Sequence, residues 1–268
     1  MRTILHLSDL HFGRIDPGML SPLRAAVLAV RPDLIAVSGD LTQRARHTEF
    51  AASRAFLDSL ELPKLIVPGN HDVPLWNIGA RFLRPFARYQ AYIAPDLEPQ
   101  HEDDEMIVIG VNTARSLTWG EGRISASQVD RIVERLAGVR RSLIRIVVTH
   151  HPFDLPPGVD ERRLVGRARM AMLALAHANA DLFLSGHLHL SHASHSVERY
   201  RIEGHSALIV QAGTVSTRAR GQAPSFNLVR VERPRIEVSK FSWDAASLSF
   251  AETAVGRYRH TERGWTGA

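Results

Sequence analysis

The stretch Thr-Ile-Leu-His-Leu-Ser-Asp-Leu-His, residues 3–11, joins a short apolar run directly to two metal-ligating side chains, Asp9 and His11. The run from Thr3 to Leu7 has the length of a buried strand. Carboxylate and imidazole groups are ligands for first-row transition metals. The stretch therefore predicts a buried strand that delivers ligands to one edge of a sheet.

The same arrangement recurs four more times along the chain. Further apolar runs at Leu34 to Val37, Leu65 to Val67, Leu143 to Val148 and Asp181 to Leu184 precede the motifs Gly39-Asp40, Gly69-Asn70-His71-Asp72, His150-His151 and Gly186-His187-Leu188-His189. One Asp or His after a strand is usually a turn or surface residue, but five such motifs in series indicate a shared site. Residues i and i+2 of an extended chain point the same way, so we expect Asp9 with His11, and His187 with His189, to face it. The three glycines suit tight turns at the strand ends.

These motifs resemble the pattern of the calcineurin-like metallophosphoesterase superfamily, which is D-x-H, G-D, G-N-H-[DE], a later His and G-H-x-H. All five elements are present between Asp9 and His189. The Leu-Ser-Asp-Leu-His opening and His150-His151-Pro152 are most similar to the bacterial class III cyclic-nucleotide and glycerophosphodiester phosphodiesterases. The resemblance implies two packed mixed β-sheets flanked by helices, a four-layer α/β/β/α sandwich with metals at one edge. The pattern of elements alone supports an α/β or α+β class.

The resemblance also implies two sets of metal ligands. Asp9, His11, Asp40 and His189 would bind one ion, and Asp40, Asn70, His150 and His187 would bind the other, which makes Asp40 the bridge. The family pattern selects His150 over His151, although strand phase alone leaves the two interchangeable. His151 is then expected to support the site or to face the substrate. Manganese, iron, zinc and cobalt all accept such mixed ligands, so two divalent or mixed-valence ions of open identity are expected.

Catalysis by such a centre needs no protein nucleophile. Two cations roughly 3.5–4 Å apart polarise a phosphoryl group and lower the pKa of a bridging water, so the resemblance implies attack by a metal-bridging hydroxide. The chain has no cysteine and no Gly-x-Ser-x-Gly motif, which agrees with this mechanism. In the family, the residue that matches His71 contacts the phosphoryl oxygen or protonates the leaving group, and we assign His71 as the general acid. Asp72 is expected to hold the other nitrogen of its ring, or alternatively to cap the loop before Pro74.

Two residues of the segment Gly213 to Arg218 are candidates for substrate contact. Family members often bring such a turn near the metals, which nominates Thr214 and Arg218, with turn chemistry as the alternative role. Asn112 and Thr113 also end a strand, where some family members place residues near the site, but we do not assign them a catalytic role.

Composition favours one domain. The chain of 268 residues is 44% hydrophobic, which is enough for a large core, and no linker divides it. We expect a single domain over residues 1–268, with the motifs in 9–189 and a β-rich part and tail in 190–268. No apolar stretch of membrane-spanning length or secretory signal is seen, so we expect a cytoplasmic protein without a membrane span. The net charge of +5 comes from scattered arginines, and we expect no stable nucleic-acid complex.

Local patterns predict several helices and strands. Ser21 and Pro22 predict the start of a helix over Leu23 to Val30, and Thr48 to Leu60 and Ser125 to Leu136 show helical periodicity. A group of four arginines is assigned to a solvent-facing helix in which Arg163 lies beside Arg167; the group consists of Arg162, Arg163, Arg167 and Arg169. Successive strands are predicted at Ala193 to Arg201, Ala207 to Ala212, Phe226 to Glu232 and Ile236 to Ser242.

Two further segments allow alternative interpretations. In Pro74 to Asp104, the residues Phe82, Phe86, Tyr89 and Ile93 recur at helical spacing, which favours one amphipathic helix packed on the sheet over a lid or lipid-facing surface. The tail from Phe241 to Ala268 is expected either to pack on the core or to pair with a second subunit, and the frequency of dimers among relatives makes a homodimer an expectation.

The sequence therefore predicts a metal-dependent phosphoric diester hydrolase that acts on a small phosphodiester of the cyclic-nucleotide or glycerophosphodiester type. The alternatives are a lipid-linked pyrophosphate or phosphodiester hydrolase and a phosphomonoesterase. A nuclease would be expected to carry more DNA-binding architecture. A protein phosphatase would carry G-D-x-x-D-R-G, from which Gly39-Asp40-Leu41-Thr42-Gln43-Arg44 departs. A non-catalytic binding scaffold would be expected to have lost ligands that are all present here.

Overall fold

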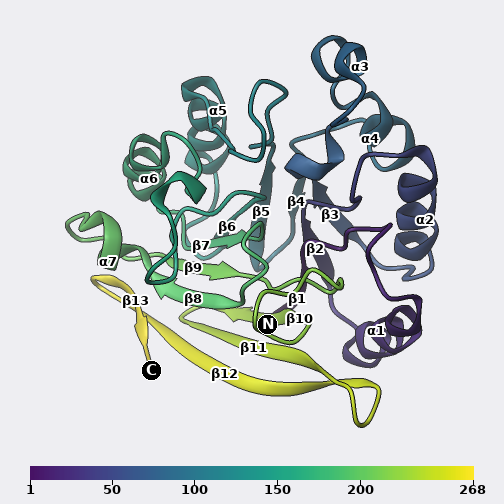
Figure 1. Ribbon diagram of the computed structural model, residues 1–268. Coiled ribbons are helices and arrows are strands. Elements are labelled where there is room, and N and C mark those ends of the chain that lie inside the picture. The colour runs from purple at the N-terminus through teal and green to yellow at the C-terminus, as the bar shows by residue number, and fades with distance from the viewer.

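Two β-sheets packed face to face form the centre of the molecule, and helices cover their outer faces (Figure 1). The computed structural model describes all residues from 1 to 268. This arrangement confirms the predicted four-layer sandwich. No helix combines the length and the apolar character that crossing a membrane requires.

The first sheet has seven strands in the order β13-β12-β11-β10-β1-β2-β3. Three of them are parallel neighbours, namely β1 (Arg2–Leu7), β2 (Leu34–Ser38) and β3 (Lys64–Val67). The others form an antiparallel meander of β10 (Ser225–Glu232), β11 (Arg235–Asp244), β12 (Ser249–Thr261) and β13 (Gly264–Gly267). Since β10 pairs with β1, the last part of the chain extends the sheet that the first motif begins.

The second sheet has six strands in the order β4-β5-β6-β7-β9-β8. Its parallel centre consists of β5 (Met106–Val111), β6 (Ile144–Thr149), β7 (Leu182–Ser185) and β9 (Leu208–Gln211). The edges are the antiparallel strands β4 (Gln100–Glu102) and β8 (His192–His195). The parallel strands of each sheet end together, and this places the five motifs at one end of the sandwich.

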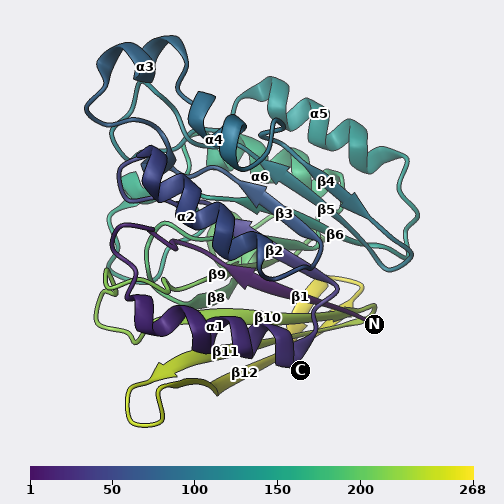
Figure 2. The same ribbon diagram turned by 90° about the vertical axis from the view of Figure 1, so that its right-hand side faces the viewer.

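Helices lie on both outer faces. The first sheet is covered by α1 (Pro17–Val30), α2 (His47–Asp58) and α4 (Ala87–Tyr92), and Figure 2 shows α1 and α2 crossing its face. The second sheet is covered by α5 (Ala126–Ala137) and α6 (Ala168–His177). The short elements are α3 (Ile78–Leu83), α7 (Ser196–Tyr200) and the 3₁₀ turns η1 (Asn70–Asp72) and η2 (Glu161–Arg163).

Three separate apolar cores hold the layers together. One lies between the sheets and contains Ile4, Val148 and Trp265. A second joins the second sheet to α5 and α6, and a third joins the first sheet to α1, α2 and α4. Strands buried on both faces explain why their sequences are continuous apolar runs rather than alternating ones.

Several local predictions were wrong. Helix α1 begins at Pro17 with Asp16 as its cap, so Ser21 and Pro22 lie inside the helix rather than at its start. The predicted strand Ala193 to Arg201 is only half a strand, because α7 follows β8 directly. Arg163 and Arg167 do not share a helix, since Arg163 ends η2 while Arg167 has a left-handed backbone before α6.

The segment from Pro74 to Asp104 does not form the single helix that its spacing indicated. It forms α3 and α4, which are separated by Pro85. Proline lacks an amide hydrogen and clashes with the preceding turn, so a helix cannot run through it without breaking. Tyr89 of α4 is buried as predicted, but Phe82 of α3 is half exposed.

Candidate metal centre

Four buried side chains meet at the ends of β1, β2 and β7. The ligand atoms of Asp9, His11, Asp40 and His189 all lie within 4.8 Å of one another. Nε2 of His189 is 3.1 Å from Oδ1 of Asp9 and 3.1 Å from Nε2 of His11. These are the four residues predicted for the first metal, and the structure brings all four together.

The residues predicted for the second metal meet beside the first group. Oδ1 of Asn70 lies 3.0 Å from Nε2 of His150 and 3.1 Å from Nδ1 of His187. Oδ1 of Asp40 lies 3.4 Å from Nε2 of His150, and its Oδ2 lies 3.6 Å from Nε2 of His11. Asp40 thus contacts both groups, which is the position that a bridging ligand needs.

Backbone carbonyls orient three of the imidazoles. The Nδ1–H group of His11 donates to the carbonyl of Thr42 (3.3 Å). The same group donates to the carbonyl of Ser38 in the case of His150 (2.8 Å) and to the carbonyl of Arg218 in the case of His189 (2.9 Å). Each Nε2 is then left with a lone pair that faces the centre. Two such lone pairs 3.1 Å apart repel each other unless a cation lies between them. Oδ1 of Asp9 has no hydrogen-bond partner at the same place, so this donor set fits a metal ion.

The electrostatics of the site favour the metal-binding forms of Asp9, Asp40 and His187. His189 is the exception: burial lowers its pKa, but the adjacent Asp9 outweighs burial and raises it. Burial raises the pKa of Asp9, but the neighbouring His189 and His11 outweigh burial and hold this pKa well below its usual range. Burial also raises the pKa of Asp40, but nearby histidines, with His150 contributing most, outweigh burial and lower this pKa overall. Burial lowers the pKa of His187 to about 3, which keeps its ring neutral. Carboxylates and neutral imidazoles are the states in which these side chains bind metals.

Left-handed backbone aims five of the candidate ligands. The φ angles are 53° at Asp9, 44° at His11, 53° at Asp40, 72° at His187 and 59° at His189. Non-glycine residues adopt this region at an energetic cost, and such residues concentrate at functional sites. Asp9 and His11 therefore share a site because of a strained turn. The extended chain from which we predicted their common direction is not present.

Close approach explains two of the predicted glycines. A Cβ atom at Gly186 would lie 1.7 Å from the Ser8 hydroxyl, and one at Gly69 would lie 2.2 Å from Oδ1 of Asp40. Neither residue has a positive φ angle. Their small size lets two ligand-bearing loops touch, and any side chain there would push the loops apart.

His71 stands at the edge of the centre next to Arg218. Its Nδ1–H donates to the carbonyl of Gln43 (2.8 Å), and its Nε2 lies 3.0 Å from Nη1 of Arg218. The same Arg218 nitrogen is 3.4 Å from Nε2 of His11. The structure thus places Arg218, a predicted substrate contact, beside His71 and the first ligand group.

The predicted contact between Asp72 and the ring of His71 is wrong. The buried carboxylate of Asp72 instead accepts hydrogen bonds from the backbone amides of Gly69, Leu41 and Thr42 and from the hydroxyl of Thr42. These contacts join the loop after β2 to the loop after β3, which is the loop-capping alternative. The role of Gln43 was not predicted from the sequence. Gln43 contributes only its backbone carbonyl, which every residue type has.

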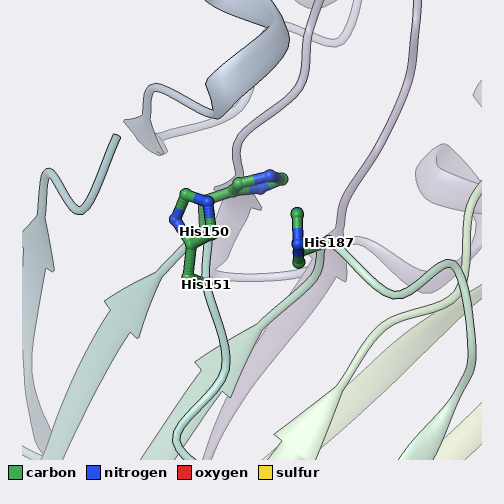
Figure 3. Close-up of side chains that lie close together, drawn as sticks. All are labelled: His150, His151 and His187. Atoms are coloured by element: carbon green, nitrogen blue, oxygen red, sulfur yellow. The ribbon is translucent and has the colours of Figure 1, made fainter. Parts of the chain in front are cut away.

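His151 lies in the same histidine group but has a different partner. Figure 3 shows it with His150 and His187, which come from the loops after β6 and β7. Nδ1 of His151 contacts the hydroxyl of Thr113 at 2.9 Å, whereas His150 faces Asn70 and Asp40. Geometry therefore favours His150 as the ligand. Burial holds the pKa of His151 well below its usual range, and its Nε2 has no partner.

Thr214 supports a ligand loop. Its buried hydroxyl donates to the backbone carbonyl of Asp9 at 2.7 Å and contacts the hydroxyl of Ser216. This is the turn role that we gave as the alternative, and the geometry offers no support for a substrate contact at Thr214.

The fold and this double cluster of candidate acidic and imidazole ligands are those of a metallophosphoesterase. The family model described as calcineurin-like phosphoesterase matches residues 2–191, and the chain belongs to that family. It is 27% identical over 202 residues to a probable cyclic nucleotide phosphodiesterase from Synechococcus, a match that covers 70% of this chain and 73% of that protein. It is 37% identical over 82 residues to the glycerophosphodiester phosphodiesterase GpdQ from Enterobacter lignolyticus, covering 26% of this chain but only 29% of that enzyme.

Solved structures share the fold. A dimetal phosphatase from Danio rerio has a TM-score of 0.66 at 14% identity, and the match covers 94% of this chain and 98% of that one. The purple acid phosphatase PPD1 from yellow lupin has a TM-score of 0.70 at 10% identity, and the match covers 95% of this chain and 53% of that one. These likenesses extend over the C-terminal strands as well as the motif region.

Proposed function

We propose that this protein is a dinuclear metal-dependent phosphodiesterase that hydrolyses small phosphodiesters of the cyclic-nucleotide or glycerophosphodiester type. The observation that carries the proposal is the pair of ligand groups that share Asp40, with His71 and Arg218 beside them. The choice of a diester is supported by the two similar proteins from Synechococcus and Enterobacter lignolyticus, which are both described as phosphodiesterases.

Seven side chains would hold the two metals in this proposal. They are Asp9, His11 and His189 for one ion, Asn70, His150 and His187 for the other, and Asp40 for both. Bound metals supply Lewis-acid polarisation of the phosphoryl group and a water that loses its proton near neutral pH. Manganese, iron, zinc and cobalt all suit these ligands.

His71 would act as the general acid. Because its Nδ1–H is committed to the Gln43 carbonyl, Nε2 is the atom that would hold a proton for the leaving oxygen. Arg218 would bind a non-bridging phosphoryl oxygen through the guanidinium that now contacts His71. Asp72 would keep the loops that carry Asp40 and His71 in register.

One surface observation favours a second candidate, a lipid-linked phosphodiester as substrate. Six large apolar side chains are exposed on α3 and two neighbouring loops: Trp76, Ile78, Phe82, Leu83, Leu117 and Trp119. Arg81 links the two loops, because it donates to the carbonyls of Pro74 and Thr118 and stacks on Trp119. Figure 2 shows α3 projecting beyond the end toward which β1 and β3 run, which is the end with the ligands.

The charge on this surface suits an anionic membrane. No acidic residue occurs between Asp72 and Asp96, and Arg84 is exposed and Arg88 partly exposed in this segment, whereas Arg81 is buried and the neighbouring loop carries the exposed Glu121. Exposed tryptophans with arginines are typical of segments that enter the lipid headgroup region.

The first experiment is turnover of bis(p-nitrophenyl) phosphate, p-nitrophenyl phosphate, cyclic AMP and a glycerophosphodiester by metal-reconstituted protein, with metal content measured. Metal-dependent diester turnover that Asp40→Ala abolishes is the expected result. Preference for the monoester would overturn the diesterase proposal, and failure to bind metal would overturn the dinuclear centre.

Vesicle sedimentation separates the two substrate classes. Binding to anionic but not zwitterionic vesicles, lost in a Trp76→Ser/Trp119→Ser variant with unchanged turnover of soluble diesters, would favour the lipid-linked substrate. The matched control is Leu173→Ser/Leu248→Ser, which removes two apolar side chains exposed elsewhere. Absence of vesicle binding would exclude the second candidate.

A further inference from the structure

A polar cavity lies at the opposite end of the strands from the candidate metal ligands. It has a volume of about 280 Å³ and is lined mainly by Arg141, Arg145, His205, Ser206, Arg233 and His260. Arg145 lies at the start of β6, while His150 follows the end of that strand. At about 3.3 Å per residue, the strand separates this cavity from the metal ligands by roughly 17–20 Å.

One carboxylate in the cavity is already fully engaged. Asp181 accepts from Nη2 of Arg233 at 2.6 and 2.7 Å, from Nε1 of Trp265 at 2.9 Å and from the backbone amide of Arg145 at 2.9 Å. Its charge is therefore compensated by Arg233. Arg141 and Arg145 also line the cavity, and neither forms an ion pair.

Several hydrogen-bond donors in this cavity are buried without a partner. Nε of Arg145, Nε of Arg233, Oγ of Ser206 and Nε2 of His205 all lack one. Arg145 and Ser206 are each only 6% exposed, so bulk water does not compensate them freely. Buried polar groups in folded proteins are nearly always hydrogen-bonded, and a cluster of unpaired donors needs an explanation.

We infer that this cavity binds a small oxyanion of the phosphate or phosphomonoester class. Two uncompensated guanidinium groups supply positive charge. The unpartnered donors of Arg145, Arg233 and Ser206 are enclosed in the cavity wall, and side-chain rotation would bring them to the ligand as directed hydrogen bonds. Guanidinium groups match the oxygen geometry of phosphate, and such charge-assisted bonds are strong. The volume admits inorganic phosphate with room for a small substituent. This site is separate from the proposed catalytic centre and does not depend on it.

Trp265 provides a local reporter for the test. Its buried indole donates to Asp181 and forms an edge contact with His260, while Arg233 lies over its ring. The chain has four tryptophans, so the indole N–H resonances of zinc-loaded protein can be assigned with Trp265→Phe and followed during titration with inorganic phosphate. Phosphate that binds only at the metals would leave the Trp265 resonance in place.

The expected result is a saturable shift of the Trp265 resonance with phosphate and no shift with chloride at equal ionic strength. Arg141→Gln should weaken this binding roughly three- to tenfold. The matched control is Arg140→Gln, because Arg140 pairs with Asp104 and does not line the cavity. Ser206→Ala tests a directed hydrogen bond without changing charge and should also weaken binding.

A Trp265 resonance that follows ionic strength alone would overturn the inference. So would equal phosphate affinity in the Arg141→Gln and Arg140→Gln variants. A phosphate-dependent shift that is unchanged in both the Arg141→Gln and the Ser206→Ala variants would also overturn it. Diester turnover by the Arg141→Gln variant is a separate measurement and reports only on the metal centre.

Discussion

Nε2 of His71 lies 3.0 Å from Nη1 of Arg218, while the other nitrogen of the same ring donates to a backbone carbonyl. A guanidinium group can only donate, so Nε2 is the acceptor in this contact, and it can hold a proton for the leaving oxygen only once Arg218 turns to the phosphoryl group. The imidazole and the guanidinium thus face the same space beside the ligands of the first metal. A phosphoryl group that entered this space would meet a cationic donor and the proposed general acid together.

The role of His71 predicts a dependence on the leaving group. A general acid typically contributes about 10²–10⁴-fold, and it matters least when the leaving oxygen is already a stable anion. We expect His71→Ala to lower kcat strongly for a glycerophosphodiester and far less for bis(p-nitrophenyl) phosphate, with both metals retained. Equal losses on the two substrates, measured at the same metal content, would contradict the general-acid role.

Arg218 should act mainly on the bound phosphoryl group. We expect Arg218→Gln to lower kcat/KM by about 10–10³-fold, because a charge-assisted contact in a partly buried site is lost. Arg218→Lys should recover part of the loss, since it keeps the charge but not the planar geometry. Arg220→Gln is the control from the same loop. If Arg218→Gln kept full activity, the contact with His71 would be structural only.

Asp72 should matter for loop stability rather than for proton transfer. Burial and the nearby Asp40 raise the pKa of Asp72 to about 6, and its carboxylate accepts from three backbone amides. Asp72→Asn places an amide NH₂ against these donors, and an unsatisfied buried group costs about 1–3 kcal/mol. We expect a lower melting temperature and weaker metal binding, with the leaving-group dependence of kcat unchanged. A changed leaving-group dependence would restore Asp72 as a partner of His71.

The sequence predicted the ligand groups better than it predicted the backbone that positions them. Asp9, Asp40 and His187 could be named because metal chemistry restricts residue type, and a motif records type and order. The left-handed turns at Asp9 and His11 could not be predicted, because their strain is supported by contacts with loops distant in sequence. Likewise, Gln43 acts through its carbonyl, which every residue has.

The errors elsewhere have similar physical causes. Helical spacing from Phe82 to Ile93 ignored Pro85, which ends α3 and separates it from α4. The oxyanion cavity was not visible in the sequence, because its walls come from residues 141 to 265 and only strand order brings them together. Patterns within one segment therefore predicted the strands of the sandwich, while sites built between segments required the structure.

His6 predicts a loss of stability in acid. Its ring is fully buried, Nε2 contacts the Ser38 hydroxyl at 2.9 Å and Nδ1 has no partner. Burial lowers its pKa from 6.5 to about 3, although Asp9 opposes this shift. Below pH 6.5 the unfolded chain gains a proton that the folded chain does not accept. The stabilisation that a neutral His6 contributes is therefore complete above pH 6.5 and is lost progressively as the pH falls toward about 3.

The measurement is the free energy of unfolding in urea at several pH values from about 4.5 to 7.5, with chelator present so that metal release does not contribute. One such group adds a slope of up to about 1.4 kcal/mol per pH unit. His6→Gln removes the titrating ring, so below pH 6.5 the free energy of unfolding of this variant should change with pH less steeply than that of the unmodified protein, by that amount. Above pH 6.5 the difference in unfolding free energy between the variant and the unmodified protein should stay constant. The buried rings of His151 and His187 also have lowered pKa values and remain in both proteins, so the variant should keep part of the slope. Parallel stability curves across the whole pH range would show that His6 takes up its proton equally well in the folded chain.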